Sequence, residues 1–558
     1  MKYYTVLLLI LFSFFAKAQK EYSELTEKAS ELMEEAKDET GYRNALALYE
    51  KAFKMYPENI DGEGLYNASV LASTLKNNEK AFQYLIPLSQ IKDDGNNYPG
   101  WSYIFGENAE KEYKNLLSDP AWNALKQKAY GYKKQFYNEL QERETEFYHT
   151  HKSTLSTVEN PEALYREIKN FNPYEPKKDR DYSIAFKIND SATTSFIIHL
   201  PQNYNPQKKY SLLFFLHGAV RNNELIDYQK ADWNLGGWNR YYTKYAEPDD
   251  VILVFPRASK QYNWMLSDHG FFMIPGMLKQ IKKSINIDDN KVFISGHSNG
   301  ATGSFSYLMK QPTQFSGFYG FNTYPKVFTG GTFVENIKNR SFINFSTDND
   351  YYYPPNANDD FTKLMNGISA DYKEYRYNGF PHWFPQFNES EPAYQILFKD
   401  LKNRKRNPFP KEISWEFDDN KYGNIDWISD IKLDTLNRTI RQHKELNFTI
   451  NKWLAYDDKD SLIAKQVDKK AFDFPRKSGK IKAVYDHNVF RIETSDIKSF
   501  SVNISPEAVD LKEKVKVYVN GKLYFSEKVK YNREFMLQIF NDTKDREQIW
   551  INYINVKI

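Results

Sequence analysis

Short runs of apolar residues recur between residues 194 and 346, and their spacing restricts the fold more than any other feature. They lie at residues 194–201, 210–218, 250–256, 291–296 and 341–346. Helical patterns separate the later runs, most clearly at residues 276–286. Continuous apolar strands that alternate with helices are typical of a mostly parallel sheet with helices on both faces. We therefore predict an α/β domain at residues 181–404.

The 558 residues are too many for one hydrophobic core, so further domains are expected on either side. In residues 19–146, apolar and small residues such as Ala45, Leu48, Tyr49 and Ala52 recur at three- and four-residue steps. This pattern predicts paired helices similar to tetratricopeptide repeats. Two roles fit it equally: a groove for a protein partner, or a helical packing module. The polar residues 147–180 predict a connector.

Residues 405–558 alternate apolar and polar side chains at a period of two. This alternation predicts an all-β, sandwich-like C-terminal domain. Within it, Asn520-Gly521 predicts a two-residue hairpin turn, because both residues readily adopt positive φ angles. A carbohydrate-binding role and a packing role both fit this domain.

The first residues have the pattern of a secretory signal peptide. Lys2 precedes an apolar stretch at residues 6–15 that is too short to span a bilayer, and Ala16-Lys17-Ala18 resembles a cleavage site. We expect residues 1–18 to be cleaved near Ala18 and the protein to be exported, to the periplasm or outside the cell. A retained N-terminal anchor is the alternative. No later stretch is apolar enough to cross a membrane.

The composition excludes several kinds of site. The sequence has no cysteine, which excludes disulfides and thiolate metal ligands. The formal net charge is +3 and no long basic stretch interleaves with aromatic residues, so nucleic-acid binding has little support. His149 and His151 have H-x-H spacing, but we expect no acidic or further histidine partner beside them. We therefore predict no metal site and no cofactor.

Ser298 lies in Gly296-His297-Ser298-Asn299-Gly300, a G-x-S-x-G pattern between an apolar strand and a helical stretch at residues 299–310. A strand, a strained turn and a helix are what a nucleophile elbow requires. We predict that Ser298 is a nucleophile. The oxyanion would rest on the N–H of Asn299 and on the N–H of Ala219 or Gly218, in the loop after residues 212–216. His217 at that strand end is expected to brace the loop rather than act as a base.

The acid and the base of such a site follow the serine in chain order. Asp350 follows the apolar run at residues 341–346 and is the predicted acid, with Asp348 as the alternative. His382, in a loop bounded by glycine and proline, is the predicted base. His297 is expected to pack beside the site. Trp264, Trp233 and Trp238 either line the acyl or alcohol pocket or fill the core.

The stretches "YSLLFFLHGA", "VILVFPRA", "NIDDNKVFISGHSNGA", "STDNDYYYP" and "GFPHWFP" resemble successive landmarks of secreted α/β-hydrolases of the feruloyl esterase and polyhydroxybutyrate depolymerase-like group. The resemblance covers about residues 182–402 and implies Ser298, Asp350 and His382 as the catalytic triad. Peptidase-like relatives share the layout. The sequence departs from the group at Asn299-Gly300-Ala301, where a bulkier residue and a second glycine are frequent, and at Ser346, where glycine is usual. The cysteine pairs of many fungal esterases are absent, and the helical region is not part of the family pattern.

These features together predict a multidomain, exported serine hydrolase that cleaves carboxylic esters, on a small molecule or on a carbohydrate or polyester polymer. A serine peptidase with the same fold is one alternative. The other is a protein that binds a partner through its N-terminal helices and carries an inert hydrolase domain.

Overall fold

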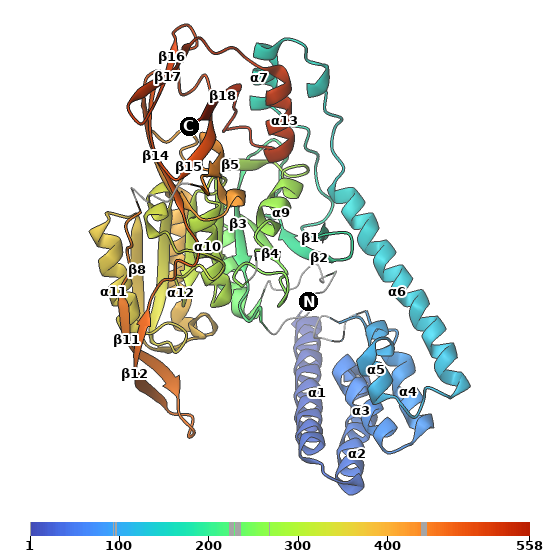
Figure 1. Cartoon of the computed structure of the whole chain (residues 1–558). Coiled ribbons are helices and arrows are strands. Elements are labelled where there is room, and N and C mark those ends of the chain that lie inside the picture. The colour runs from blue at the N-terminus through green and yellow to red at the C-terminus, as the bar shows by residue number, and fades with distance from the viewer. Residues whose placement is uncertain are drawn as a thin grey trace. The chain divides into compact units, whose positions relative to one another are not determined.

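The computed structural model describes residues 2–92, 94, 98–221, 228, 236–266, 268–436 and 443–558, and for residues 2–16 only the backbone. The chain forms two compact units, Met1–Arg143 and Glu144–Ile558. Figure 1 shows the elements of both units.

The first unit is helical. Its helices are α1 (Lys2–Glu35), α2 (Glu39–Met55), α3 (Gly62–Thr74), α4 (Asn78–Leu88) and α5 (Glu107–Glu112), and α6 (Pro120–Phe147) begins within it. Ala45, Ala52, Ala68 and Ala72 are completely buried, as expected for alanines that let paired helices approach closely. Asp38, Asp61 and Asn77 cap α2, α3 and α4 by accepting backbone N–H groups. The kind of helical repeat stays a prediction.

The second unit is built around an eight-stranded sheet in the order β1-β2-β4-β3-β5-β6-β7-β8. The strands are β1 (Asp181–Lys187), β2 (Thr193–His199), β3 (Tyr210–Leu216), β4 (Ile252–Pro256), β5 (Ile287–Gly296), β6 (Gly317–Phe321), β7 (Ser341–Asn349) and β8 (Tyr372–Pro381). Strand β2 pairs antiparallel with β1 and β4. From β4 onward in this order, through β3 and β5 to β8, each strand is parallel to the next. This order, with its antiparallel edge, is that of the α/β-hydrolase fold.

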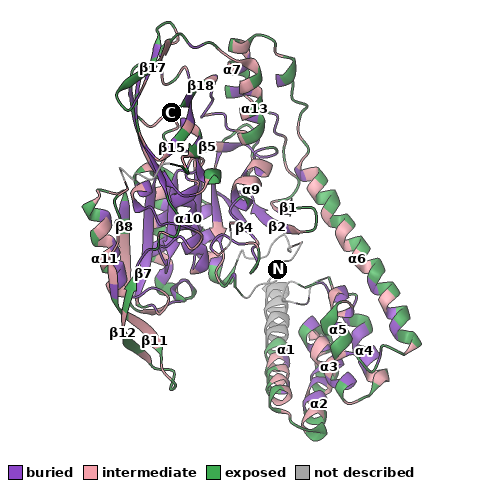
Figure 2. Ribbon diagram, in the orientation of Figure 1, coloured by how far each residue is buried: buried purple, intermediate pink, exposed green. Residues whose placement is uncertain are grey.

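Helices cover both faces of this sheet; the strands from β2 to β7 are mostly buried, whereas the edge strand β8 is mostly half-buried or exposed (Figure 2). On one face, α8 (Arg240–Ala246) and α12 (Glu391–Asn403) share a core with Leu213, Leu253 and Phe293. On the other face, α9 (Met273–Ile281), α10 (Asn299–Lys310) and α11 (Pro355–Gly367) pack against the alternate strand residues. The inner strands are therefore buried between two helical layers, which explains their continuous apolar runs.

The C-terminal residues add further sheets. A five-stranded sheet has the order β17-β16-β14-β13-β9, a three-stranded sheet the order β10-β15-β18, and β11 and β12 form a hairpin. The strands are β9 (Glu412–Phe417), β10 (Ile428–Leu433), β11 (Thr449–Tyr456), β12 (Leu462–Lys470), β13 (Gly479–Asp486), β14 (Val489–Ser495), β15 (Ile497–Ile504), β16 (Val515–Val519), β17 (Lys522–Glu527) and β18 (Asn552–Lys557). Asn520 and Gly521 have positive φ angles between β16 and β17, as predicted for a hairpin turn.

One expectation for the flanking segments was wrong. The C-terminal segment is not all-β, because α13 (Arg533–Thr543) interrupts it; Asn532 caps this helix, and Met536 and Phe540 bury its apolar face. The predicted connector contains a helix, α7 (Pro161–Lys169), which packs against α13.

The C-terminal sheets and the eight-stranded sheet share one core. The same cluster of buried apolar side chains contains Met277 of α9 and Phe305 of α10, and Trp415, Ile492 and Val556 of the C-terminal strands. The predicted boundary near residue 404 therefore crosses a continuous core, although the division into domains stays a prediction.

Most of the expected signal peptide, residues 1–18, lies in the part of the chain whose side chains the structure does not describe. Among the described residues, no helix has both the length and the hydropathy needed to cross a bilayer.

Candidate active site

Ser298 occupies the turn between β5 and α10. Its φ and ψ angles are 58° and −122°, a conformation that non-glycine residues rarely adopt. The flanking glycines allow the strand and the helix to approach: a Cβ on Gly296 would lie 2.3 Å from the carbonyl carbon of Gly300, and one on Gly300 would lie 1.8 Å from the carbonyl oxygen of Leu216. The G-x-S-x-G pattern thus forms the strained turn that was predicted for it, and α10 begins directly afterwards at Asn299.

Ser298, His382 and Asp350 form a hydrogen-bonded chain. The Oγ of Ser298 lies 2.8 Å from Nε2 of His382, and Nδ1 of His382 lies 2.8 Å from Oδ1 of Asp350. Asp350 directly follows β7 and His382 directly follows β8, so the ends of neighbouring parallel strands bring the two residues together. The carboxylate is 1% exposed and the imidazole 8% exposed. This arrangement can remove a proton from the serine hydroxyl.

The carboxylate of Asp350 is held by several donors. It accepts hydrogen bonds from the side-chain amide of Asn322 at 3.1 Å and from the N–H of Tyr352 at 2.8 Å, besides the one from His382. Asp348, the alternative acid, instead accepts the N–H of Gly379 at 2.7 Å. The structure therefore places Asp350, and not Asp348, against the imidazole.

Paired substitutions test this difference between the two aspartates. We expect Asp350→Asn to lower kcat about 10⁴-fold, because an amide can no longer hold His382 in the tautomer that accepts the serine proton. Asp348→Asn keeps the oxygen that accepts from Gly379 and should change kcat little. Steady-state kinetics on one ester would compare them. A large loss in Asp348→Asn with a small one in Asp350→Asn would reverse the assignment.

The loop after β3 reaches the turn that carries Ser298. Ala219 has a positive φ of 55°, and the next N–H, that of Val220, donates to Oδ1 of Asn299 at 3.2 Å. The amide of Asn299 in turn donates to the hydroxyl of Tyr352 at 2.9 Å. The Asn299 side chain therefore ties together the three loops that carry the predicted oxyanion donors, the nucleophile and the acid.

Two buried histidines hold the surrounding backbone. Nδ1–H of His217 donates to the carbonyl of Gly218 at 2.8 Å, and its Nε2 accepts the N–H of Ala258 at 3.1 Å. Nε2–H of His297 donates to the carbonyl of His382 at 2.8 Å. Burial lowers the pKa of His217 to about 4; burial, with a smaller effect of His382, lowers the pKa of His297 to about 3. Both rings are neutral braces at neutral pH.

Burial of neutral His297 should make the stability of the fold depend on pH. An unfolded histidine binds a proton near pH 6.5, whereas folded His297 does so only near pH 3. The unfolded chain therefore binds more protons between these values, and the free energy of unfolding falls as the pH is lowered through this window. Urea denaturation at several pH values between 6 and 4.5 gives the free energy of unfolding as a function of pH. We expect this free energy to change less steeply with pH in His297→Gln than in wild type, by about 1.4 kcal/mol per pH unit. Identical slopes would contradict a buried neutral imidazole.

The tryptophans predicted near the pocket have different positions. Trp264 is completely buried and its ring packs 5.0 Å from that of His217, so it fills the core beneath the loop instead of facing a substrate. Trp238 is 41% exposed and its ring lies 5.4 Å from that of His297. Trp233 lies outside the described residues.

The sequence reasoning did not single out the tyrosines that follow the acid. The rings of Tyr351 and Tyr352 lie 5.1 and 5.0 Å from that of His382. Burial raises the pKa of Tyr352 to about 12, so its hydroxyl stays protonated. Their position directly after Asp350 was the only signal in the sequence.

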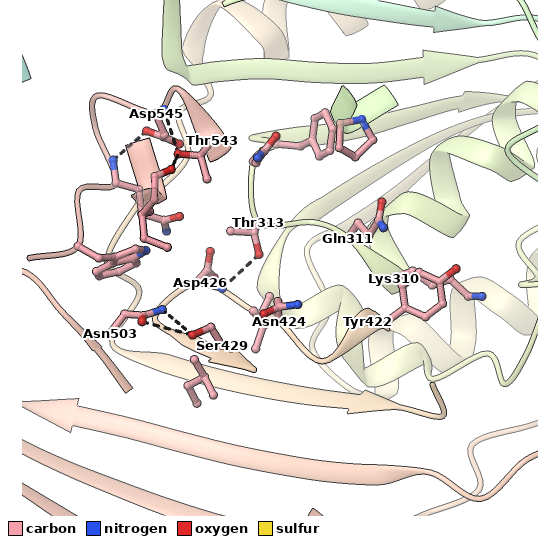
Figure 3. A pocket seen from close by; sticks show the side chains of 18 of the residues that line it. Lys310, Gln311, Thr313, Tyr422, Asn424, Asp426, Ser429, Asn503, Thr543 and Asp545 are labelled. Atoms are coloured by element: carbon pink, nitrogen blue, oxygen red, sulfur yellow. Dashed lines mark hydrogen bonds between the residues drawn. The ribbon is translucent and has the colours of Figure 1, made fainter. Parts of the chain in front are cut away.

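Another pocket, of about 310 Å³, lies at the far end of α10, between that helix and the C-terminal strands (Figure 3). Among its polar side chains, Asn503 pairs with Ser429, and the Thr313 hydroxyl accepts the N–H of Asp426. We assign it no chemistry. The expectation that His149 and His151 lack an acidic partner was wrong, because both pair with Glu175. Within the described ranges no cluster of three histidine, aspartate or glutamate residues fits a metal ion.

Several solved structures resemble part of the chain. The match to a thermostable esterase covers 41% of this chain, at 20% identity and a TM-score of 0.33. It covers 64% of the length of the esterase chain, which is less than two thirds. The S-formylglutathione hydrolase of Staphylococcus aureus matches 40% of this chain and 100% of its own, at 14% identity and a TM-score of 0.31. Dipeptidyl peptidase 4 of Porphyromonas gingivalis matches 40% of this chain and 36% of its own, at 12% identity and a TM-score of 0.32. No protein-family model and no curated protein matches. Because these TM-scores are low, the functional proposal rests on the site itself.

Proposed function

We propose that the protein is a serine hydrolase that cleaves carboxylic esters through Ser298, His382 and Asp350. The observation that carries this proposal is the hydrogen-bonded chain from Ser298 through His382 to Asp350, with the serine on a strained turn at the start of α10.

In the proposed reaction, Nε2 of His382 takes the proton of Ser298 as Oγ attacks the ester carbonyl carbon. The tetrahedral oxyanion rests on the backbone N–H groups of Asn299 and Ala219, and Asp350 stabilises the imidazolium. The imidazolium then protonates the departing alkoxide, which leaves an acyl group on Ser298. Water, deprotonated by His382, attacks this acyl-enzyme and releases the acid.

The same groups can cleave an amide, so a serine peptidase is the nearest alternative. An amide needs its leaving nitrogen protonated before the bond breaks, whereas an ester oxygen leaves more readily. Comparing kcat/KM for an acyl ester and for an aminoacyl amide with the same acyl group separates the two activities. Because a serine peptidase would also cleave the more reactive ester, the amide decides between them: we expect turnover of the ester and no measurable turnover of the amide.

A fluorophosphonate probe tests the proposal directly and also tests the inert-domain alternative. We expect covalent labelling of the wild-type protein, located by mass spectrometry on the peptide that contains Ser298, and no labelling of Ser298→Ala. Labelling at a different serine, or none in the wild type, would refute the proposal.

Export with cleavage near Ala18 is part of the same proposal and rests on the N-terminal sequence. Determining the N-terminal residue of the secreted protein tests it.

A further inference from the structure

The β11–β12 hairpin, far downstream in the sequence, contacts the loop that carries the acid. Nε1–H of Trp453 donates to the carbonyl of Tyr351, the residue after Asp350, at 3.0 Å. The amide of Asn356 at the start of α11 donates to the carbonyl of Lys452 at 3.1 Å. Figure 1 shows the hairpin beside α11 and β8, extending beyond them.

Trp453 fixes the hairpin in this position. Its ring packs against those of Tyr324 at 5.6 Å and Tyr353 at 6.0 Å. On β12, the ammonium group of Lys469 lies 4.5 Å from the centre of the same ring, within the range of a cation–π interaction. Strand β11 is therefore attached directly to the acid loop through Trp453, and Lys469 of β12 packs on the same ring.

Exposed aromatic rings surround Tyr351 next to the imidazole. The Tyr351 ring lies 5.1 Å from His382, 6.3 Å from Trp383 and 5.7 Å from Tyr456 at the end of β11. Trp383 is 36% exposed and Tyr456 is 40% exposed. Neighbouring aromatic rings left open to solvent beside a reactive group form a surface on which another flat ring can stack.

We propose that Tyr351, Trp383 and Tyr456 form a subsite that stacks a flat ring of the substrate, and that the β11–β12 hairpin is thereby part of the active site. This proposal rests on the proposed esterase function. The shared chemistry is a ring with an apolar face, which either an aromatic acid or a sugar can supply.

Binding to the inactive Ser298→Ala protein tests the subsite without turnover. The probes are methyl cinnamate, with an aromatic ring in the acid, and an O-acetylated methyl glucoside, with a sugar ring in the alcohol. By isothermal titration, we expect Tyr456→Ala to raise the Kd of at least one probe about 3- to 10-fold. Tyr456→Phe, which keeps the ring, should stay within about twofold. Tyr524→Ala removes a similarly exposed tyrosine on β17 and is the matched control.

The response of the two probes identifies the source of the ring. A loss confined to methyl cinnamate assigns the subsite to an aromatic acid, and one confined to the glucoside assigns it to a sugar. Unchanged Kd values in Tyr456→Ala, equal losses in Tyr524→Ala, or no binding of either probe would overturn the subsite. Hydrolysis of ethyl acetate, which has no ring, tests the esterase function separately. If the wild type hydrolyses ethyl acetate and Ser298→Ala does not, a failed binding test refutes only the subsite. If the wild type does not hydrolyse ethyl acetate, the esterase function itself is refuted.

Discussion

Ser298→Ala should lower kcat for a chromogenic short-chain ester by about 10⁵- to 10⁶-fold. Without Oγ there is no atom for His382 to deprotonate and no acyl-enzyme can form. The remaining rate would come from the oxyanion donors and from substrate binding, which still act on a water molecule. Steady-state kinetics on purified protein measures the change.

Ser304→Ala is the matched control for this substitution. Ser304 is a buried serine on α10, the helix that begins directly after Ser298, but its hydroxyl donates to the carbonyl of Ile294 at 3.2 Å. We expect it to retain most of the wild-type kcat. Substantial turnover by Ser298→Ala would show that another residue is the nucleophile.

Asp289→Asn should destabilise the second unit by about 3–5 kcal/mol, because it leaves buried cations without their partner. Asp289 on β5 lies 2.7 Å from Nζ of Lys282 and 3.1 Å from Nε of Arg546, and all three side chains are at most 2% exposed. Arg546 belongs to the C-terminal segment between α13 and β18. A loss of this size is a large part of the roughly 5–15 kcal/mol that stabilises a typical domain.

Urea unfolding at pH 7, followed by tryptophan fluorescence, would measure this loss. Asp190→Asn is the control: it removes the same charge from an ion pair with Lys187 in which Asp190 is fully exposed, and we expect no measurable change. An unfolding midpoint of Asp289→Asn equal to that of wild type would show that the C-terminal segment does not stabilise the eight-stranded sheet through these charges.

The sequence by itself determined the features that depend on near neighbours. Apolar strand runs, the strand–turn–helix around Ser298 and the Asn520-Gly521 turn follow from local periodicity and backbone preference, and each is present in the structure. The serine, aspartate and histidine were found because the α/β fold fixes the order in which strand ends carry them. Their catalytic roles stay a proposal that the labelling and kinetic experiments test.

Only the tertiary structure decided which side chains meet. Asp348 and Asp350 are two residues apart, and the paths of β7 and β8 determine that Asp350 contacts His382 while Asp348 accepts from Gly379. The bridging amide of Asn299 and the neutral braces His217 and His297 depend on loops that are distant in the chain. The hairpin that brings Tyr456 to Tyr351 lies about a hundred residues beyond the acid. Local patterns carry no information about such contacts, because they arise only when the core has packed the strands and loops together.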